Sequence, residues 1–587
     1  MIIPRPDQFD LDIAPVCQRQ IEHRIGRLAP VLHPVKVDAF DDVERPHAHR
    51  LRPMGHRRIE ILRHESQLHD VAQGGDCARQ THIPLQSARV TPCRDCVIFS
   101  PGDTAQSART RAPMNEIKDI ARADRCPGIS YTDMLNGDTR RAPDYLFEES
   151  HIEMGDDPLP VAPYISEEFA ALEREKMWPN VWLFAAREDE MPDAGDTVVF
   201  DIAGKSFLLI RQKDGGVKAF YNACLHRGRK LRTESGNSVQ LRCPFHGFTW
   251  RNDGSLKEIP CAWDFKHLEG KEMSLPEARV ELWQGFVMLT ENHDLPDFKT
   301  WLGPAASHYE RYDFAGRYTG MWVQKKIPAN WKATAEAFME AWHSITTHPQ
   351  LLAFLGDANT RYDLIGDHFN RAITPSGVLS PHVKGKNSDY VLEKMNEFSG
   401  GADAATNRRF NASGTPQEYD ANDPLGARKV LAEAGRKGFA EQYGYDYSDA
   451  ADTEILDNFT YNIFPNFAPW IGFLPTLVYR WLPGDTPDWC IMEIRLLFPT
   501  PKGQERPRSV AMTYIPDDEP FAWANDIMGP QLANVFDQDM ANLPYVQEGM
   551  KSMKDGLMEL GHYQDSRVRH FQTTLMKYVN GELPAAS

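Results

Sequence analysis

Two short pairs of residues with metal-binding side chains lie close together in the first half of the chain. One pair is Cys224 and His226, the other is Cys243 and His246, and 16 residues separate the two pairs. Thiolate and imidazole groups are the ligands that proteins use for zinc and for iron–sulfur centres. This spacing is too specific to arise readily by chance in a chain of this composition. The four residues therefore predict a metal centre held by two loops, each of which supplies one thiolate and one imidazole.

Two kinds of metal centre use two cysteines and two histidines. Zinc fingers usually take both cysteines from one loop and both histidines from another, whereas here each pair is mixed. In a Rieske [2Fe–2S] cluster two cysteines hold one iron and two histidines hold the other, so each of two facing loops supplies one ligand of each kind. The stretches CLHRG and CPFHGFTW closely resemble the loops of such clusters. We therefore expect the four residues to bind a [2Fe–2S] cluster.

A second group of candidate ligands follows in the stretch NWKATAEAFMEAWHSITTHPQL. Its first asparagine can cap a helix over 331–346, on which Glu340 and His343 would share one face. His348 would lie about 140° round a regular helix from His343, but Pro349 disfavours helix at His348 and lets it fold back. Two histidines and one carboxylate form the facial triad that binds Fe(II) and leaves positions open for O₂. The alternative is two ordinary helix histidines, one packed and one exposed.

The elements around the first group of ligands predict a small antiparallel β domain at about 180–297. The stretches TVVFDI, SFLLIRQ, VKAFYNAC and LWQGFVMLTE each have the composition of a strand. Turn signals at 214–216 (DGG) and 252–254 (NDG) predict two hairpins. We therefore expect both Cys/His pairs on loops at the tips of this domain.

The second half of the chain contains longer strand patterns. TLVYRWL and WCIMEIRLLFP, joined by PGD, predict two long neighbouring strands, and SVAMTYIPD predicts another. The segment 383–455 is charged and rich in glycine. It is expected to be either a mobile lid over the iron or a solvated insertion.

Composition separates the first 113 residues from the rest. Segment 1–113 has no Trp or Tyr and a net charge of +2, whereas 114–587 contains all 13 Trp and all 19 Tyr and has a net charge of −20. Because 1–113 also lacks a helical or strand period, we expect a disordered arm or an over-long start before Met114. The total charge of −18 argues against nucleic-acid binding, and no apolar run is long enough for a membrane span. Nine cysteines in so long a chain are no disulfide framework, which predicts a cytoplasmic protein.

Most of residues 150–560 resembles, in the order of its motifs, the large (α) subunit of Rieske non-heme iron oxygenases. The matching motifs are the two cluster loops, NWK, Glu340-x-x-His343, His348-Pro349, NIFPN and VFDQDMANLPYVQEGM. In this family the third iron ligand is an aspartate eight residues before the glutamine of a VQxG ending. The resemblance therefore implies Asp539 as the third ligand, with Asp537 as the alternative.

The resemblance also implies a fold and an activity. The fold is α+β, with the Rieske domain at 180–297 and a helix-grip catalytic domain at 298–587, a twisted antiparallel sheet around a long helix to which 114–179 contributes. The activity is that of a terminal oxygenase, which uses O₂ and electrons from a separate NAD(P)H-dependent reductase. It would hydroxylate, dihydroxylate or oxidatively dealkylate a small aromatic or otherwise apolar substrate. Each subunit would hold one [2Fe–2S] cluster and one mononuclear Fe(II).

The partners that the resemblance implies are a ferredoxin, a ferredoxin reductase or both, and a homotrimer with or without a small β subunit. Electrons would pass from His246 of one subunit through Glu340 to His343 of the next. Two departures from the common family pattern are Ala337, where many members have Asn, and Glu340, where many have Asp. Glu at this place is known in a branch that includes carnitine and choline oxygenases. The rival function is a non-catalytic Rieske electron carrier or an iron–sulfur sensor.

Overall fold

The computed structural model describes residues 128–400 and 419–582. The prediction for segment 1–113 lies outside these residues, as does 401–418 in the middle of the expected lid. None of the helices in the described part is both long and apolar enough to cross a membrane.

The expected β domain is built from short antiparallel strands. Within the described residues, seven of them form one sheet in the order β2-β11-β10-β5-β4-β3-β6, and three form a second sheet, β7-β8-β9. Both predicted hairpins are confirmed, because β4 pairs with β5 around 214–216 and β8 pairs with β9 around 252–254. The bounds are β2 (Leu183–Arg187), β3 (Asp196–Ile202), β4 (Lys205–Arg211), β5 (Val217–Tyr221), β6 (Gly236–Asn237), β7 (Leu241–Arg242), β8 (Thr249–Trp250), β9 (Leu256–Glu258), β10 (Glu277–Trp283) and β11 (Phe286–Thr290).

One strand prediction in this domain is wrong. The stretch LWQGFVMLTE does not form a single strand, because the chain reverses at Gln284 and Gly285 between β10 and β11. Both residues have positive φ, 50° and 79°, which is the backbone conformation of a two-residue hairpin turn. The turn is hidden in the sequence, because β11 is buried along its whole length and continues the apolar run.

The second half of the chain contains a larger sheet. Its eight strands in the described structure have the order β13-β14-β15-β16-β17-β18-β12-β19, and all neighbours are antiparallel except β12 and β19. TLVYRWL and WCIMEIRLLFP are confirmed as the neighbours β17 and β18, whereas SVAMTYIPD contributes only the three residues of β19. The bounds are β12 (Arg317–Ile327), β13 (Arg361–Ile365), β14 (Phe369–Thr374), β15 (Asn458–Ile463), β16 (Phe467–Pro469), β17 (Thr476–Pro483), β18 (Cys490–Pro499) and β19 (Thr513–Ile515).

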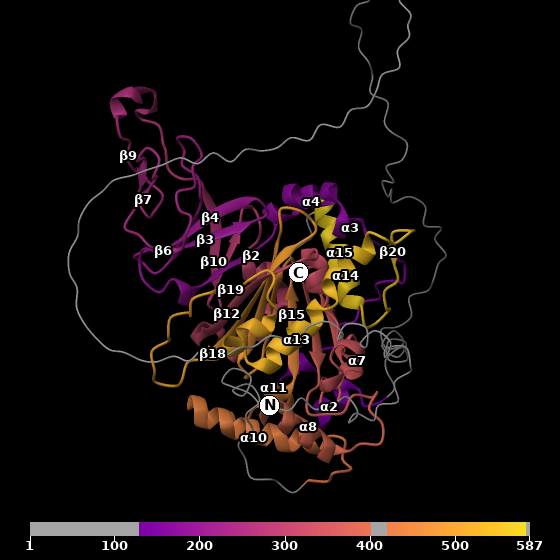
Figure 1. Cartoon of the computed structure of the whole chain (residues 1–587). Coiled ribbons are helices and arrows are strands. Elements are labelled where there is room, and N and C mark those ends of the chain that lie inside the picture. Colours follow the sequence, from indigo (N-terminus) through magenta and orange to yellow (C-terminus); the bar gives the residue numbers. More distant parts are fainter. Residues whose placement is uncertain (1–127, 401–418, 583–587) are drawn as a thin grey trace, which may run out of the picture. The chain divides into compact units, whose positions relative to one another are not determined.

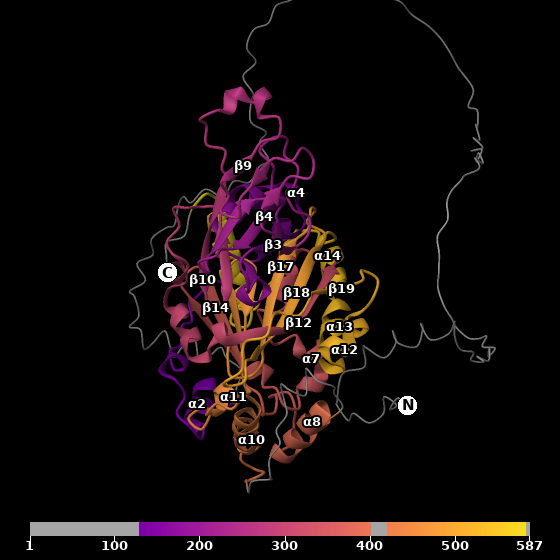
Figure 2. The same ribbon diagram turned by 90° about the vertical axis from the view of Figure 1, so that its left-hand side faces the viewer.

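Helices pack on this sheet and carry the late candidate ligands (Figures 1 and 2). The helix α15 contacts β13 and β14, and α6 contacts β17 and β18. Residues before the β domain join the same region, because β1 (Leu159–Pro160) pairs with β20 (Leu557–Met558). These layers confirm the predicted α+β class. The helix bounds are α2 (Tyr131–Gly137), α3 (Ala162–Ile165), α4 (Glu167–Leu172), α5 (Phe298–Leu302), α6 (Trp331–Glu336), α7 (Ser344–Thr347), α8 (Ser388–Gly400), α10 (Gly426–Tyr443), α11 (Asp452–Leu456), α12 (Asn525–Met528), α13 (Pro530–Met540), α14 (Leu543–Met550) and α15 (Ser566–Val579).

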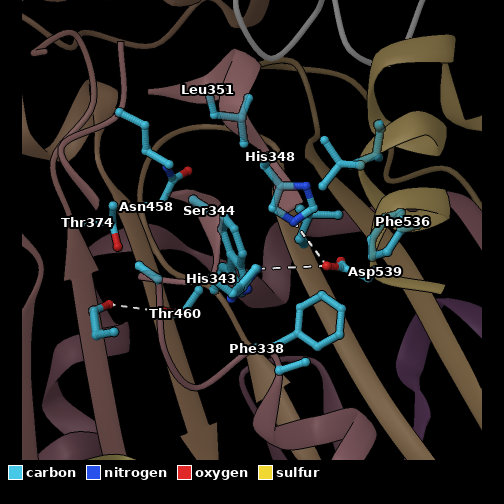
Figure 3. Close-up of a pocket in the computed structure, with 18 of the residues that line it drawn as sticks. Phe338, His343, Ser344, His348, Leu351, Thr374, Asn458, Thr460, Phe536 and Asp539 are labelled. Carbon is cyan, nitrogen blue, oxygen red and sulfur yellow. Dashed lines mark hydrogen bonds and ion pairs between the residues drawn. The ribbon is translucent and has the colours of Figure 1, made fainter. Parts of the chain in front are cut away.

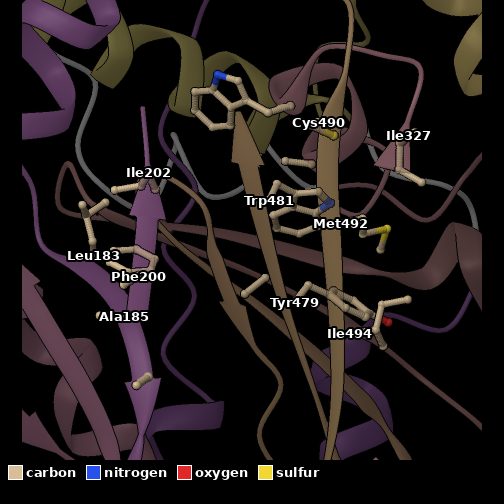
Figure 4. Close-up of a cluster of buried hydrophobic side chains, with 14 of the residues drawn as sticks. Leu183, Ala185, Phe200, Ile202, Ile327, Tyr479, Trp481, Cys490, Met492 and Ile494 are labelled. Atoms are coloured by element: carbon tan, nitrogen blue, oxygen red, sulfur yellow. The ribbon is translucent and has the colours of Figure 1, made fainter. Parts of the chain in front are cut away.

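One cluster of buried apolar side chains is shared by the two large sheets (Figure 4). Leu183 and Phe200 come from the β domain, and Trp481, Met492 and Ile494 come from the larger sheet. All five are at most 3% exposed. Burying one such side chain stabilises the fold by about 1.5–3 kcal/mol, so the shared cluster holds the two sheets against each other.

The described part of the expected lid, 383–455, is mainly helical. Its helices α8, α10 and α11 carry Val391, Phe439 and Ile455, which form an apolar cluster with Phe354. A segment with its own buried cluster differs from a solvated insertion. Its role as a lid stays a prediction.

A buried ion network joins the larger sheet to strand β2. Glu493 on β18 accepts hydrogen bonds from Arg480 and Arg495, both at 2.9 Å, and all three side chains are at most 5% exposed. Arg480 also donates to the backbone carbonyls of Phe184 and Ala185 on β2. Burial alone would raise the pKa of Glu493, but the two guanidinium groups lower it to about 2. The carboxylate is therefore charged in the folded protein at neutral pH.

Glu493→Gln should lower the free energy of unfolding at pH 7 by about 3–5 kcal/mol, because Arg480 loses its carboxylate partner and the two buried guanidinium groups are left with the single carboxylate of Glu190. A carboxylate with a depressed pKa stabilises the fold above its unfolded pKa of about 4.3. The difference between wild type and variant should therefore shrink as the pH falls from about 4.3 toward 2. Urea denaturation between pH 7 and pH 3.5 measures it. Glu310→Gln, in an exposed pair with Lys299, is the control, and an equal loss in both variants would contradict the network's role.

Candidate metal centres

The helix that was expected over 331–346 is interrupted. The helix α6 ends at Glu336 and α7 begins at Ser344, so the prediction of one regular helix is wrong. Side chains take up backbone groups in the break: Arg567 Nη1 donates to the carbonyl of Met339 at 3.0 Å, and Tyr362 Oη accepts the N–H of Ala341 at 3.1 Å. Because these groups find partners outside the helix, the chain can leave helical geometry without burying them unpaired.

The two candidate histidines lie at the two ends of the short helix α7, just after this break. Glu340 closes the break locally, since Oε2 accepts the backbone N–H of His343 at 3.0 Å and Oε1 lies 2.5 Å from His343 Nδ1. His348 ends α7 with φ −126° and ψ 53°, which confirms the expected loss of helix before Pro349. The rings of His343 and His348 then lie 5.1 Å apart between centroids.

The third candidate ligand arrives from helix α13, almost 200 residues later (Figure 3). Asp539 Oδ1 lies 3.0 Å from His348 Nε2 and 3.8 Å from His343 Nε2, and the ligand atoms of all three residues lie within 4.8 Å of one another. Asp537 is turned elsewhere, because its carboxylate accepts the backbone N–H groups of Phe521 and Ala522 at 2.6 and 3.0 Å. The geometry therefore favours Asp539 over Asp537 as a ligand.

The hydrogen bonds around the triad fit a bound cation. The Nδ1 atoms of His343 and His348 face oxygen acceptors on Glu340 and Gln538, at 2.5 and 2.9 Å. Each Nδ1 therefore carries the proton, and each Nε2 directs a lone pair toward the Asp539 carboxylate. Three acceptors that converge in a partly buried site repel one another unless a cation lies between them. Two imidazole nitrogens and one carboxylate oxygen are the donor set that the facial-triad prediction requires.

The electrostatics of His343 point the same way. Burial alone would lower its pKa, but its hydrogen bond to Glu340 and the charges of Glu340 and Asp539 raise it above the usual value. The carboxylates of Glu340 and Asp539 therefore favour positive charge on or beside the His343 ring.

A cavity of about 190 Å³ opens beside the triad. Among the described residues that line it, those with a carboxylate or an imidazole are Glu340, His343, His348 and Asp539, all at the metal-binding end. Aromatic rings form part of the wall, with Phe338 5.0 Å from Tyr479 and 6.1 Å from Phe536 between centroids. Figure 3 shows Thr374 and Thr460 across the cavity from Asp539. The remaining lining residues are Ser344, Ser376, Asn458 and Trp470, which carry polar groups, and the apolar Ala337, Ala341, Leu351, Phe354, Leu355, Ala372, Phe398, Leu477, Leu496, Leu532 and Val535.

The cavity is less polar than its threonines imply. The hydroxyl of Thr374 is hydrogen-bonded to Thr360 at 2.9 Å, and that of Thr460 donates to the carbonyl of Ala372 at 3.2 Å. Both hydroxyls therefore have partners in the protein. The aromatic wall and Gln538 were missed in the sequence, although Gln538 directly precedes Asp539 and could have been considered with it.

The two Cys/His loops share one backbone design. The N–H of Gly228 donates to the carbonyl of Cys224 at 2.9 Å, and that of Gly247 donates to the carbonyl of Cys243 at 3.0 Å. Each glycine lies four residues after its cysteine and has positive φ, 73° and 80°, so a side chain there would strain the turn. The glycines therefore close two matching turns, each with one thiol and one imidazole.

The four side chains in these loops lie close together. Cys224 and Cys243 are buried and unbridged, and the rings of His226 and His246 lie 4.6 Å apart between centroids. Burial raises the pKa of the Cys224 thiol, and the neighbouring Cys243 raises it further. His226 Nδ1 is buried without a hydrogen-bond partner in the described structure, as expected for an atom that binds a metal. The arrangement fits two thiolate and two imidazole ligands of a [2Fe–2S] cluster.

Comparisons with known proteins agree with both centres. Residues 181–269 match the family model of the Rieske [2Fe-2S] domain, and residues 298–581 match that of the ring hydroxylating alpha subunit (catalytic domain). Chlorobenzene dioxygenase subunit alpha from Cupriavidus sp. (strain PS12) is 34% identical over 31% of this chain and 42% of its own length. The carnitine monooxygenase oxygenase subunit from Acinetobacter pittii (strain PHEA-2) is 28% identical over 32% and 51%.

The matches to these relatives thus span less than two thirds of each relative's length. Among solved structures, naphthalene 1,2-dioxygenase from Rhodococcus sp. bound to indole is 19% identical, with a TM-score of 0.49 over 73% of this chain and 95% of that one. The two family models together cover more than half of the 587 residues, in the expected order. The chain belongs to the family of Rieske oxygenase large (α) subunits.

Proposed function

We propose that the protein is the terminal component of a multi-component oxygenase. It would use O₂ and electrons from a separate NAD(P)H-dependent reductase, directly or through a ferredoxin, to hydroxylate, dihydroxylate or oxidatively dealkylate an organic substrate. The observation that carries the proposal is the triad of His343, His348 and Asp539 at one end of an apolar cavity. Family membership supports it, as do relatives whose names are those of dioxygenases and of a monooxygenase.

Two cofactors belong to this proposal. The loops of the β domain would hold one [2Fe–2S] cluster through Cys224, His226, Cys243 and His246, and the triad would hold one mononuclear Fe(II). When bound, the cluster supplies electrons singly and the iron supplies the site of O₂ activation. The protein's own side chains fix the tautomers of the two triad histidines, and the apolar walls exclude water from the substrate.

The cavity favours an uncharged, flat substrate. An ionised carboxylate that is buried without a partner costs several kcal/mol, and the described lining contains no lysine or arginine to pair with it. Arg567 is a buried cation nearby, but it is not one of the described lining residues and donates to Met339, Asn370 and Thr460. The rings of Phe338, Tyr479 and Phe536 offer an apolar surface on which an aromatic ring can pack.

We also propose that three subunits form a ring, with or without a small β subunit. In this ring Glu340 would link His343 of its own chain to His246 of the neighbouring subunit. Glu340 already accepts two hydrogen bonds from His343, one at each carboxylate oxygen. A carboxylate can accept a further hydrogen bond, so Glu340 can serve a second imidazole.

Reconstitution with a reductase and a ferredoxin tests the function. Neutral and carboxylate forms of one skeleton, naphthalene with 2-naphthoate and biphenyl with 4-biphenylcarboxylate, would be compared by O₂ consumption and product mass. We expect turnover of neutral compounds at least about tenfold faster, because no lysine or arginine of the described lining can pair with the buried carboxylate. Faster turnover of the carboxylates would contradict the substrate class, and no O₂-dependent product from a wider screen would contradict the oxygenase.

His343→Ala and Asp539→Ala should each lose the mononuclear iron and turnover but keep the visible spectrum of the cluster, because the two centres are built from different segments of the chain. Iron content should fall from about three to about two atoms per subunit. Asp537→Ala is the matched control and should keep the third iron, since its carboxylate holds backbone N–H groups. About two irons in the wild type would instead favour the electron carrier or sensor.

Glu340→Gln should leave both centres assembled but lower reductase-driven turnover at least about a hundredfold, or about 2.7 kcal/mol of barrier. The amide keeps the size of the side chain but removes its charge and offers one acceptor in place of two. Product formed with hydrogen peroxide, which supplies oxygen and electrons together, should fall much less. Equal losses in both assays would show that Glu340 serves the iron site and not the electron path.

A further inference from the structure

A pair of glutamines lies behind His348 on the side away from the triad. Gln538 Oε1 is 2.9 Å from His348 Nδ1 and accepts a second hydrogen bond from Gln350 Nε2 at 2.7 Å. In return, Gln538 Nε2 donates to Gln350 Oε1 at 3.2 Å. The two amides thus bond to each other in both directions, and one oxygen of the pair also serves the imidazole.

We propose that Gln538 is a positioning residue for the metal ligand His348, and that Gln350 fixes the orientation of the Gln538 amide. The inference rests on the proposed function, because it assigns a metal to the triad. In this role, Gln538 Oε1 accepts a hydrogen bond from His348 Nδ1 and so keeps the proton on that nitrogen. The lone pair of Nε2 then lies beside Asp539.

The reciprocal bonds explain why one glutamine alone would not be enough. A side-chain amide has an oxygen at one end and an NH₂ group at the other, and the two ends have nearly the same shape. If the Gln538 amide turned over, its NH₂ would face His348 Nδ1 and favour the tautomer with the proton on Nε2. That N–H would point at the metal position. If Gln538 turned over alone, both bonds to Gln350 would break, and only a simultaneous turn of Gln350 would restore them, so the pair opposes a turn of Gln538 by itself.

The position of Gln538 in the chain couples two ligands. Gln538 and Asp539 are consecutive residues on α13, so one helix supplies a ligand and the support of another ligand. His348 and Gln350 are likewise two residues apart at the start of the short turn Pro349–Leu351. Helix α13 and the stretch 348–350 are therefore joined at two places, once through the triad and once through the amide pair. A small shift of α13 would move Asp539 and the acceptor for His348 together.

Affinity for Fe(II) tests the proposal with a readout other than turnover. The mononuclear iron is removed by a chelator from the full-length, cluster-containing protein, and Fe(II) is titrated back. Gln538→Leu should raise the dissociation constant by about 10–100-fold, the usual effect of losing an outer partner of a metal-bound histidine. Gln538→Glu should stay within about threefold, because a carboxylate accepts the Nδ1–H and has no donor end. Gln350→Leu should weaken binding by about 3–10-fold, because the amide can then turn over.

Two controls make every outcome informative. Gln531→Leu makes the same change two turns earlier on α13, where the side-chain oxygen has no hydrogen-bond partner in the described structure, and it should leave affinity unchanged. The visible spectrum of the cluster shows whether each variant folds. If Gln538→Leu does not fold, the Fe(II) dissociation constants of Gln538→Glu and Gln350→Leu test the proposal in its place.

The outcomes separate this inference from the proposed function. If the wild-type protein takes up no more Fe(II) than His343→Ala does, the triad binds no iron and the proposed function is contradicted. Wild-type protein that binds one Fe(II), with Gln538→Leu binding as tightly, overturns the positioning role. Equal loss in Gln538→Leu and Gln538→Glu also overturns it, because the acceptor oxygen would then not be the feature that matters.

Discussion

The convergence of three acceptors at one point is the constraint on which the rest of the catalytic region depends. Two imidazole nitrogens and a carboxylate oxygen within 4.8 Å are unfavourable neighbours without a cation. They are held there by partners that themselves are fixed: Glu340 at His343 and Gln538 at His348. Because each partner is an acceptor, both protons stay on the outer nitrogens. The preference for a metal is thus built into the hydrogen bonds before any metal binds.

The interrupted helix is the structural counterpart of this constraint. A regular helix would keep His348 far round from His343, so the backbone leaves helical geometry at His348, and a separate break between residues 337 and 343 interrupts the helix before His343. The freed backbone groups find partners on distant elements, the Arg567 guanidinium of α15 and the Tyr362 hydroxyl of β13. The sheet and the long C-terminal helix therefore do more than cover the site. They stabilise the conformation that a local sequence of good helix formers would not adopt alone.

The difference between local and distant contacts explains what the sequence could predict. The candidate cluster ligands, two hairpin turns and the neighbouring long strands follow from local spacing. Local hydrogen bonds, such as that from Gly228 N–H to the carbonyl of Cys224, stabilise the turns at the candidate cluster ligands. The helix break could not be predicted, because its partner Arg567 lies 228 residues beyond Met339 in the chain. The choice between Asp539 and Asp537 needed the packing of α13 as well. Family resemblance pointed to Asp539, but only the packing shows that Asp537 caps the segment at Phe521.

Buried charge is handled in two different ways in this protein. In the network of Arg480, Glu493 and Arg495, opposite charges meet directly and join two sheets. Arg567 is equally buried, yet its hydrogen bonds in the described structure go to neutral oxygens, and burial lowers its pKa to about 9 while Tyr362 and Glu340 raise it. Its charge interacts with that of Glu340, and Arg567 is not among the described residues that line the cavity. The cation thus offsets the Glu340 carboxylate beside the triad and leaves the described cavity lining without a lysine or arginine.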